Sequence, residues 1–432
     1  MQRKRSRGFP SADKRRSSRI IFLNNYYYPD CSATSQLLTD LAEHLASSGH
    51  EVFVVASRRL YDKDQASLPR VEERRGVQIR RLWTTPFGRR GLVGRSVDYA
   101  TFHITASLYL LLLARRGDVV VSKTDPPLIG ILAWVVAKSK GADLINWCQD
   151  IFPETAAALG LRILPGFLSR ALIQLRNQGL KAASTNVAIS DAMCAKLCRE
   201  GVSRDRILTI PNWPQRGIQP LTSDSASRRH DWNLSGRFVI GYSGNLGRAH
   251  LPDHVLHLVG DMADMSDVTM LFVGGGRGMR IIKEAAAQRD YSHLVFKPLQ
   301  PKEELDRCLA VPDLHLISLD PACDGYLMPS KYYGVLAAGK AVAFLGNAAS
   351  ALAQEIRDQD CGIVLDIKAP HLWRGQIDEL RRDRDRLASM GRNARQLFEQ
   401  RYTADAALAA WRGVVADVRT TVRKPYPTPV TD

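Results

Sequence analysis

The chain has 432 residues, of which 45% are hydrophobic and 24% charged, and its formal net charge is +16. This composition is ordinary for a folded soluble protein, and the length exceeds what one hydrophobic core usually fills, which argues against a single domain. The surplus of positive charge favours an anionic partner: a nucleic acid, an anionic membrane or a phosphorylated substrate.

Neither the cysteines nor the apolar stretches indicate a special class of protein. The seven cysteines are scattered without the spacing of a zinc site, so we expect reduced thiols and neither disulfides nor a structural metal. The longest apolar stretches, 104–114 and 128–137, are short enough to be buried elements, and we expect no transmembrane helix. Residues 1–18 are basic but lack the apolar segment of a secretory signal, which predicts a disordered tail.

The first half of the chain alternates strands and helices. Residues 19–23 predict a strand, 34–48 a helix with leucines at helical spacing, and 51–55 the next strand. Further strands are expected at 118–121, 143–147 and 186–189. A strand, a helix and a strand in close succession form a βαβ unit, which implies a parallel sheet. We therefore expect an N-terminal Rossmann-like domain over residues 19–214.

The pattern restarts in the second half, after a polar stretch at 215–236 that reads as a linker. Strands are expected at 238–243, 268–273, 294–296, 314–318, 341–345 and 362–365. They predict a C-terminal Rossmann-like domain over 237–401, a helix at 402–420 packing back on the N-terminal domain, and a tail at 421–432. The predicted fold class is α/β, with two doubly wound domains facing a cleft.

Glycine-rich turns follow two strands of the second half. The first contains Gly244, Asn245, Gly247 and Arg248, and the second contains Gly275. Ligands bind at the carboxyl ends of strands in open α/β sheets, where glycine lets the backbone approach a phosphate and arginine offers it a bidentate fork. An ordinary turn with a solvated arginine explains the same residues. Neither turn completes a dinucleotide-binding or P-loop fingerprint, which disfavours those two classes.

An acidic residue and a lysine precede a small-residue helix: Asp324 and Lys331, the latter after Ser330. A carboxylate can accept hydrogen bonds from sugar hydroxyls, while a lysine at a helix start can neutralise phosphate. Asp324 before a glycine is also a common turn signal. The helix dipole disfavours a lysine in a first turn, so Lys331 points to an anionic ligand.

Polar residues also follow strands of the first half. Gln149, Asp150 and Glu154 come after the strand at 143–147, where a carboxylate could orient an acceptor hydroxyl or accept its proton. Capping of a helix near Pro153 explains Asp150 and Glu154 as well. Tyr28 and Ser32 lie in the first strand-to-helix loop, where aromatic rings stack on a sugar or cover the sheet edge.

Together these residues resemble the retaining, GT-B-type glycosyltransferases of family 4, in the branch that builds exopolysaccharide, colanic acid and O-antigen. The resemblance covers roughly residues 19–420 and includes Tyr27-Tyr28-Pro29, the segments 147–154, 188–190 and 210–212, the turn at 241–248, and Pro329-Ser330-Lys331 with the segment 337–340. It implies transfer of a sugar from a UDP- or GDP-sugar with retained anomeric configuration, without a metal and without a cofactor.

The resemblance also implies roles for single residues. The catalytic group is expected to comprise Asp150, Arg248, Lys331 and Asp324. The residues expected to bind the nucleotide sugar are Gly244, Asn245, Gly247, Gly275, Ser330 and Tyr332. The acceptor side is expected to include Tyr28, Ser32, Gln149 and Glu154. Two family features are missing: Gly334 stands where the second glutamate of the E-x7-E signature holds the ribose, and the segment 148–150 lacks the usual histidine.

The expected acceptor is a polyprenyl-diphosphate-linked or other glycan, and the expected location is the cytoplasmic face of the membrane, as a peripheral protein, since the basic surplus suits an anionic lipid carrier and an anionic leaflet. A sugar-nucleotide epimerase of the same fold is a close alternative. A basic nucleic-acid-binding protein is an alternative of another class, disfavoured because no nucleic-acid module is recognisable.

Overall fold

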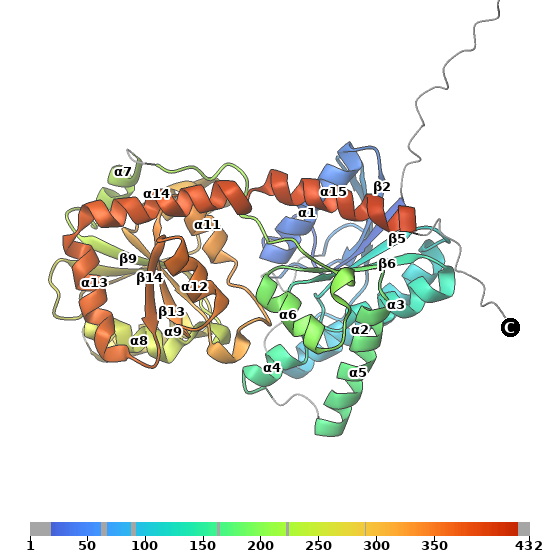
Figure 1. Ribbon diagram of the computed structural model, residues 1–432, viewed down its shortest axis with the longest axis horizontal. Coiled ribbons are helices and arrows are strands. Elements are labelled where there is room, and N and C mark those ends of the chain that lie inside the picture. The colour runs from blue at the N-terminus through green and yellow to red at the C-terminus, as the bar shows by residue number, and fades with distance from the viewer. Residues whose placement is uncertain are drawn as a thin grey trace, which may run out of the picture.

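The computed structural model describes residues 19–61, 67–87, 92–161, 165–221, 224–289 and 291–421. They form two lobes, each built on a largely parallel sheet covered by helices on both faces (Figure 1). The predicted pair of parallel-sheet α/β domains is therefore confirmed. The tails predicted at 1–18 and 421–432 lie outside the described residues, apart from residue 421.

The first sheet, as far as the chain is described, has eight strands in the order β3-β4-β2-β1-β5-β6-β7-β8. All neighbours are parallel except β3 and β4. The strands are β1 (Arg19–Leu23), β2 (Glu51–Ser57), β3 (Val71–Arg74), β4 (Val77–Leu82), β5 (Val119–Lys123), β6 (Asp143–Cys148), β7 (Thr185–Ala188) and β8 (Ile207–Thr209).

Alternating residues of these strands build two cores, one on each face of the sheet. Ile20 and Phe22 pack with α1 (Ala33–Ser47), whereas Ile21 and Leu23 pack with α2 (Leu92–Leu113) and α3 (Ile129–Lys140). A third helix, α5 (Gly166–Ala182), packs on α3 through Gly179, and Figure 1 shows it projecting from the lobe. Short helices α4 (Glu154–Ala158) and α6 (Asp191–Arg199) follow β6 and β7.

Helix α2 differs from the expectation that the apolar stretch 104–114 is buried. Phe102, Ala106 and Leu110 are buried in the core, but Ile104 and Leu112 on the other side of the helix are exposed. By length and composition the segment Val93–Leu113 could cross a membrane. Its buried side, however, is part of the core of the lobe. The expectation was wrong for the outward side, because an apolar run does not show which of its residues face the sheet.

The second sheet has the strand order β11-β10-β9-β12-β13-β14 within the described residues. All its neighbours are parallel. Its strands are β9 (Phe238–Asn245), β10 (Val268–Gly275), β11 (Leu294–Lys297), β12 (Leu314–Ser318), β13 (Ala341–Gly346) and β14 (Gly362–Asp366). One face is covered by α8 (Pro252–Asp261), α9 (Arg277–Gln288) and α13 (Trp373–Arg382), and the other by α11 (Lys331–Ala337), α12 (Ala351–Asp358) and part of α14 (Arg384–Arg401).

The C-terminal helix α15 (Ala404–Thr421) leaves the second lobe and lies across the first (Figure 1). Its Trp411 lies 4.8 Å from the ring of Trp147 on β6, and Trp147 stacks on Trp213 at 6.0 Å between ring centroids. The stretch predicted as a linker includes α7 (Asp224–Asp231), whose Arg229 donates to the backbone oxygen of Val311 in the second lobe. Two stretches of chain therefore join the lobes.

Candidate functional site

The centre of the carboxyl edge of the second sheet consists largely of glycines, which have no side chains. Strands β9 and β10 run in register to their ends, where Gly244 pairs with Gly274 and Asn245 with Gly275. Gly244 has φ +108° and Gly274 has φ +124°, and a Cβ on Gly274 would lie 2.5 Å from the Gly244 oxygen. Only glycine fits both the backbone angles and the close approach. This edge therefore exposes backbone, and at Gly275 a Cβ would meet nothing within 4 Å.

Lys331 reaches this edge from the start of α11. Its Nζ donates to the Asn245 oxygen at 3.1 Å and lies 4.8 Å from the centre of the Tyr242 ring. No carboxylate of the described residues lies within 4.0 Å of it. Burial lowers the pKa of Lys331 to about 8. The site thus contains a partly buried cation whose charge no acidic side chain neutralises, which is the arrangement that an anionic ligand completes.

His250 lies beside Lys331 and was not among the predicted site residues. Its Nδ1 lies 2.8 Å from the backbone oxygen of Ser318 and therefore carries the proton, which leaves Nε2 as an acceptor 3.5 Å from Lys331 Nζ. Burial, and secondly the charge of Lys331, lower the pKa of His250 to about 3. The neutral imidazole holds the lysine without adding charge. A histidine in a turn, two residues after Arg248, is an ordinary sequence and gave no signal for this role.

The remaining residues of the first glycine-rich turn lie at the same edge. Gly247 and Arg248 begin the short 3-10 helix η2 (Arg248–His250), and the Arg248 side chain is exposed without an interaction among the described residues. Asn245 is exposed, and its Oδ1 packs on Gly276, where a Cβ would approach it to 2.2 Å. Arg248 is therefore free to meet a ligand at this edge.

Of the two predicted residues beside Lys331, one lies at the surface and the other in the core. Ser330 is exposed at the N-cap of α11. Tyr332 is fully buried, and its hydroxyl donates to Glu355 Oε2 at 3.0 Å. The structure does not bring Tyr332 to the sheet edge, because successive helical residues point about 100° apart and Lys331 takes the direction of the edge.

Asp324 lies in the loop after η4 (Pro321–Cys323), where the two lobes touch. The Ile151 N–H donates to the Tyr326 oxygen at 3.0 Å, and Lys196 Nζ lies 4.2 Å from the centre of the Tyr326 ring. Burial raises the pKa of Asp324, and the charge of Lys196 opposes this rise. Ile151, Lys196 and Tyr326 follow the carboxyl ends of β6, β7 and β12, so the ligand-binding edges of both sheets meet in this region.

Two carboxylates mark the first lobe's side of this region. Asp150 Oδ1 is buried without a hydrogen-bond partner, and burial raises the pKa of Asp150 against a hydrogen bond from Thr124 and the charge of Arg95. Asp125, which was not predicted, has its pKa raised to about 7 by burial, opposed by Arg95 and reinforced by Asp150. Carboxyl groups with a raised pKa, one bearing an unused acceptor, can take a proton from a hydroxyl.

A cavity of about 50 Å³ lies beside Asp150. Ser122, Lys123 and Asn146 line it from the sheet, Ile131 from α3, and Arg176 and Gly179 from α5. This volume holds a few water molecules but no sugar. The Asp150 side chain therefore borders a small cavity whose walls include residues of α3 and α5.

Four residues predicted on the acceptor side are engaged within the protein. Gln149 and Asn212 exchange hydrogen bonds of 3.0 and 2.9 Å between their amides. Glu154 is the first residue of α4 and forms a bidentate ion pair of 2.6 and 2.8 Å with Arg176.

The other two are in the first strand-to-helix loop. The guanidinium of Arg74 lies 3.6 Å from the centre of the Tyr28 ring, and Ser32 donates to Asp30. These contacts favour the structural interpretations of Glu154 and Tyr28 and show that Gln149 and Ser32 also hydrogen-bond within the protein.

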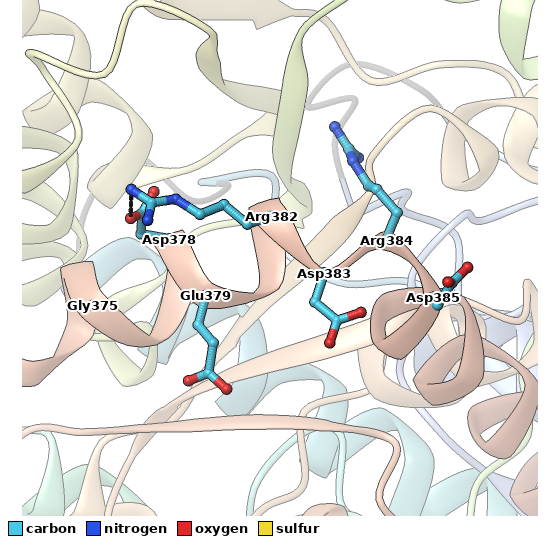
Figure 2. Close-up of a pocket in the computed structure, with 7 residues that line it drawn as sticks. All are labelled: Gly375, Asp378, Glu379, Arg382, Asp383, Arg384 and Asp385. Carbon is cyan, nitrogen blue, oxygen red and sulfur yellow. Dashed lines mark ion pairs between the residues drawn. The ribbon is translucent and has the colours of Figure 1, made fainter.

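Figure 2 shows a second pocket, at the junction of α13 and α14, lined by Gly375, Asp378, Glu379, Arg382, Asp383, Arg384 and Asp385. Arg382 pairs with Asp378 at 2.6 Å, and Arg384 lies 3.2 Å from Asp313, the residue before β12. The pocket is thus at the amino end of the sheet, opposite the glycine-rich edge, and no hydrophobic side chain is among the residues that line it. Among the described residues no group of three or more His, Cys, Asp or Glu is placed to hold a metal ion.

Comparison with known sequences finds similar proteins and a family model for the first lobe. Residues 34–213 match the glycosyl transferase 4-like domain. The chain is 24% identical over 350 residues to the putative colanic acid biosynthesis glycosyl transferase WcaI of Escherichia coli, covering 78% of this chain and 85% of that protein. It is 26% identical to the probable glycosyltransferase WbjE of Pseudomonas aeruginosa, covering 72% and 77%. A GDP-mannose-dependent alpha-mannosyltransferase of Mycobacterium tuberculosis is 24% identical, with 69% and 72% covered.

Solved structures share the whole two-lobed arrangement. Sucrose-phosphate synthase from Thermosynechococcus elongatus superposes with a TM-score of 0.74 at 14% identity, covering 94% of this chain and all of that one. HepE of Anabaena, in complex with UDP and glucose, gives a TM-score of 0.68 at 14% identity, covering 93% and 100%. At this identity the likeness concerns the fold, and it confirms the predicted GT-B arrangement.

Proposed function

Because the chain carries a glycosyl transferase 4-like domain on a GT-B fold, we infer that it is a glycosyltransferase of polysaccharide biosynthesis, and we propose that it takes its sugar from a UDP- or GDP-sugar. One relative depends on GDP-mannose, and one structural neighbour was solved with UDP and glucose. The proposed reaction keeps the anomeric configuration and needs no metal. The expected acceptor is a lipid-linked or other glycan on the cytoplasmic face of the membrane.

The observation that carries this proposal is the position of Lys331. No carboxylate of the described residues neutralises its charge, and it lies at the carboxyl edge of the second sheet, where glycine backbone is exposed. A nucleotide sugar brings two phosphate charges on a linker that must approach backbone closely, and Gly275, where a Cβ would meet nothing within 4 Å, leaves room for that approach. Lys331, and Arg248 on the exposed side, supply the opposing charge. Helix α9 begins beside them at Arg277 with no acidic residue in its first turn, which adds the positive end of its dipole.

These groups act most strongly when the bond to the sugar breaks. The acceptor oxygen forms a bond to the anomeric carbon, while the bond from that carbon to the β-phosphate oxygen breaks and its electron pair leaves with the nucleoside diphosphate. The new negative charge then appears next to Lys331 and Arg248. Cations already in place stabilise the transition state more than the ground state, and this difference is what accelerates the reaction.

The acceptor proton has two places to go. In a retaining transfer the hydroxyl approaches on the same face as the leaving group, so the departing phosphate can take the proton. Asp150, with its free buried oxygen, is the protein group placed to orient the hydroxyl or share that proton. Asp324, at the seam between the lobes, is proposed to hold hydroxyls of the sugar.

The test measures binding by thermal stability, and conversion of the donor sugar by mass analysis of reactions without an acceptor. Thermal stability of the purified chain is measured with UDP-, GDP- and dTDP-sugars, and we expect one class to raise the melting temperature. Replacing Lys331 with methionine, which keeps the apolar stem, should abolish that rise, whereas Lys283→Ala, on the exposed side of α9, should leave it unchanged. The proposal fails if no nucleotide sugar stabilises the parent. Conversion of the sugar without an acceptor would instead identify an epimerase.

A further inference from the structure

Helix α2 presents a continuous apolar surface to the outside of the first lobe. Val93, Val97, Ile104, Leu108, Leu111 and Leu112 are all exposed, and we call this set the apolar ridge. Their spacing of three, four or seven residues places them along one side of the helix, with Leu112 adjoining, opposite the buried side that contacts the sheet. Leu112 is 85% exposed and Ile104 is 61% exposed. Monomeric soluble proteins rarely leave a continuous apolar patch of this kind uncovered.

Neighbouring segments extend this surface. Thr105 of α2 donates to the backbone oxygen of Trp83, and both Trp83 and Phe87 are more than half exposed. Helices α3 and α5, which cover the lobe beside α2, add exposed Val135 and Phe167. Aromatic side chains next to an aliphatic helix are typical of proteins that rest in the interface of a bilayer.

Nearly all charged residues of α2, α3 and α5 are basic. Between their bounds α2, α3 and α5 contain one acidic residue, Asp98, which accepts a hydrogen bond from Thr85. Their basic residues are Arg95, Lys138, Lys140, Arg170, Arg176 and Lys181. Lys138, Arg170 and Lys181 are exposed. An apolar surface with cations around it complements the acyl boundary and the anionic headgroups of a bilayer.

We propose that the apolar ridge of α2, with the basic residues of α3 and α5, is the surface by which this protein docks on an anionic membrane. Helix α2 then lies in the plane of the interface and does not cross the bilayer, because Phe102, Ala106 and Leu110 are fixed in the core of the lobe. A second copy of the chain is a poorer occupant. A two-fold contact through the same surface would bring the cations of both copies together.

The proposal extends the proposed function, because it gives a lipid-linked acceptor a route to the site. The inner sides of α3 and α5 wall the cavity beside Asp150, through Ile131 and Gly179. A protein resting on α2, α3 and α5 would therefore hold the carboxyl edge of its first sheet close to the membrane surface. An acceptor whose lipid remains in that membrane would present its glycan at this edge of the sheet, on the side of Asp150.

The experiment measures flotation of the full chain with vesicles of equal parts phosphatidylglycerol and phosphatidylethanolamine, and with vesicles of phosphatidylcholine. The test variant combines Ile104→Glu with Leu112→Glu. The matched control combines Leu299→Glu with Leu372→Glu, since both leucines are exposed in the second lobe. We expect the parent and the control to bind the anionic vesicles and the test variant to bind at least about tenfold more weakly. All three proteins keep the basic residues 1–18, so the tail does not explain a difference.

Two results would overturn the proposal: parental binding by the test variant, or a parent that floats with neither kind of vesicle. A dimeric parent that becomes monomeric in the test variant, without vesicle binding, would assign the ridge to a second copy. Stabilisation by nucleotide sugar is measured on the same proteins and should be equal in all of them. If nucleotide sugar does not stabilise the parent, the proposed function is refuted. If nucleotide sugar stabilises the parent but the parent does not float with vesicles, only the docking surface is refuted.

Discussion

The affinity for a nucleotide sugar should fall as the pH rises through about 8, because burial lowers the pKa of Lys331 to about 8 in the unliganded protein. A diphosphate binds the protonated lysine and not the neutral one. Below pH 8 Lys331 is protonated in most protein molecules. Above pH 8 Lys331 is mostly neutral, so binding of a ligand must be accompanied by uptake of a proton. The diphosphate of a nucleotide sugar stays fully ionised across this range, so the charge that the lysine meets does not change.

The size of the effect follows from the fraction of lysine that is protonated. With a pKa near 8, about nine tenths of the molecules carry the proton at pH 7 and about one tenth at pH 9, so the dissociation constant should rise about tenfold between these values. Lys331→Met removes a charge-assisted hydrogen bond worth about 1.5–3 kcal/mol, which weakens binding by about 10- to 100-fold at pH 7. Its affinity should no longer depend on pH in this range.

Isothermal titration calorimetry at pH 7, 8 and 9 measures these constants, in buffers of matched ionic strength because charge screening alters them too. Lys331→Arg is the matched control, since it keeps the charge but does not titrate. A parent whose affinity is constant from pH 7 to 9, or a methionine variant with the parental slope, would refute the role of the lysine.

Unfolding gives an independent check on the same pKa. Between pH 8 and the ordinary lysine value of 10.5 the unfolded chain holds a proton that the folded chain has lost. The free energy of unfolding of the parent should therefore increase with pH in this window. Lys331→Met should show a smaller increase in urea titrations, and part of the increase should remain, because burial also lowers the pKa of Lys340 to about 8.

Four further substitutions, one of them a control, test the packing of the site and of the core. Gly274→Ala should lower the free energy of unfolding by about 2 kcal/mol or more, since its Cβ would lie 2.5 Å from backbone. Gly275→Ala is the control and should be tolerated, because its Cβ would meet nothing within 4 Å. Equal urea midpoints for the two variants would contradict this prediction. Tyr332→Phe should lose about 1 kcal/mol with its hydrogen bond to Glu355 and keep full calorimetric affinity for nucleotide sugar; a weaker affinity would return this residue to the site. Trp411→Ala should lose about 3–5 kcal/mol in guanidinium unfolding, and a loss below 1 kcal/mol would contradict its place in the core.

The parallel sheets were predictable because their strands are short apolar runs that alternate with amphipathic helices. Elements at the edge of the first sheet were not predicted: β3 and β4 form an antiparallel pair around Gly76, and charged residues interrupt their apolar pattern. Helix α2 was missed over its first half, since apolar residues on two opposite sides leave no single periodic stripe. The contacts within the folded chain do not explain the apolar outward face of α2, whereas the proposed docking on a membrane does.

The site was predictable where backbone geometry dictates residue type. Gly244 and Lys331 break local preferences, the first through its positive φ and the second through its place in a first helical turn, and both lie at the sheet edge. His250 and Asp125 were missed because a histidine in a turn and an aspartate before a proline are ordinary sequences. Glu154 was ambiguous for the opposite reason, since its partner Arg176 is 22 residues away in the chain and no local pattern announces the pair.

The two lobes divide the proposed chemistry by the kind of constraint each imposes. At the second sheet the ligand meets glycine backbone, so its phosphates are placed by the strand register of β9 and β10 and not by side-chain choice. At the first sheet the reacting groups are the carboxylates Asp125 and Asp150, whose raised pKa values depend on remaining buried. The contact between Ile151 and Tyr326 joins these two edges. A change in the angle between the lobes would therefore move the carboxylates relative to the glycine edge while leaving that edge intact, so it should impair transfer without impairing sugar-nucleotide binding.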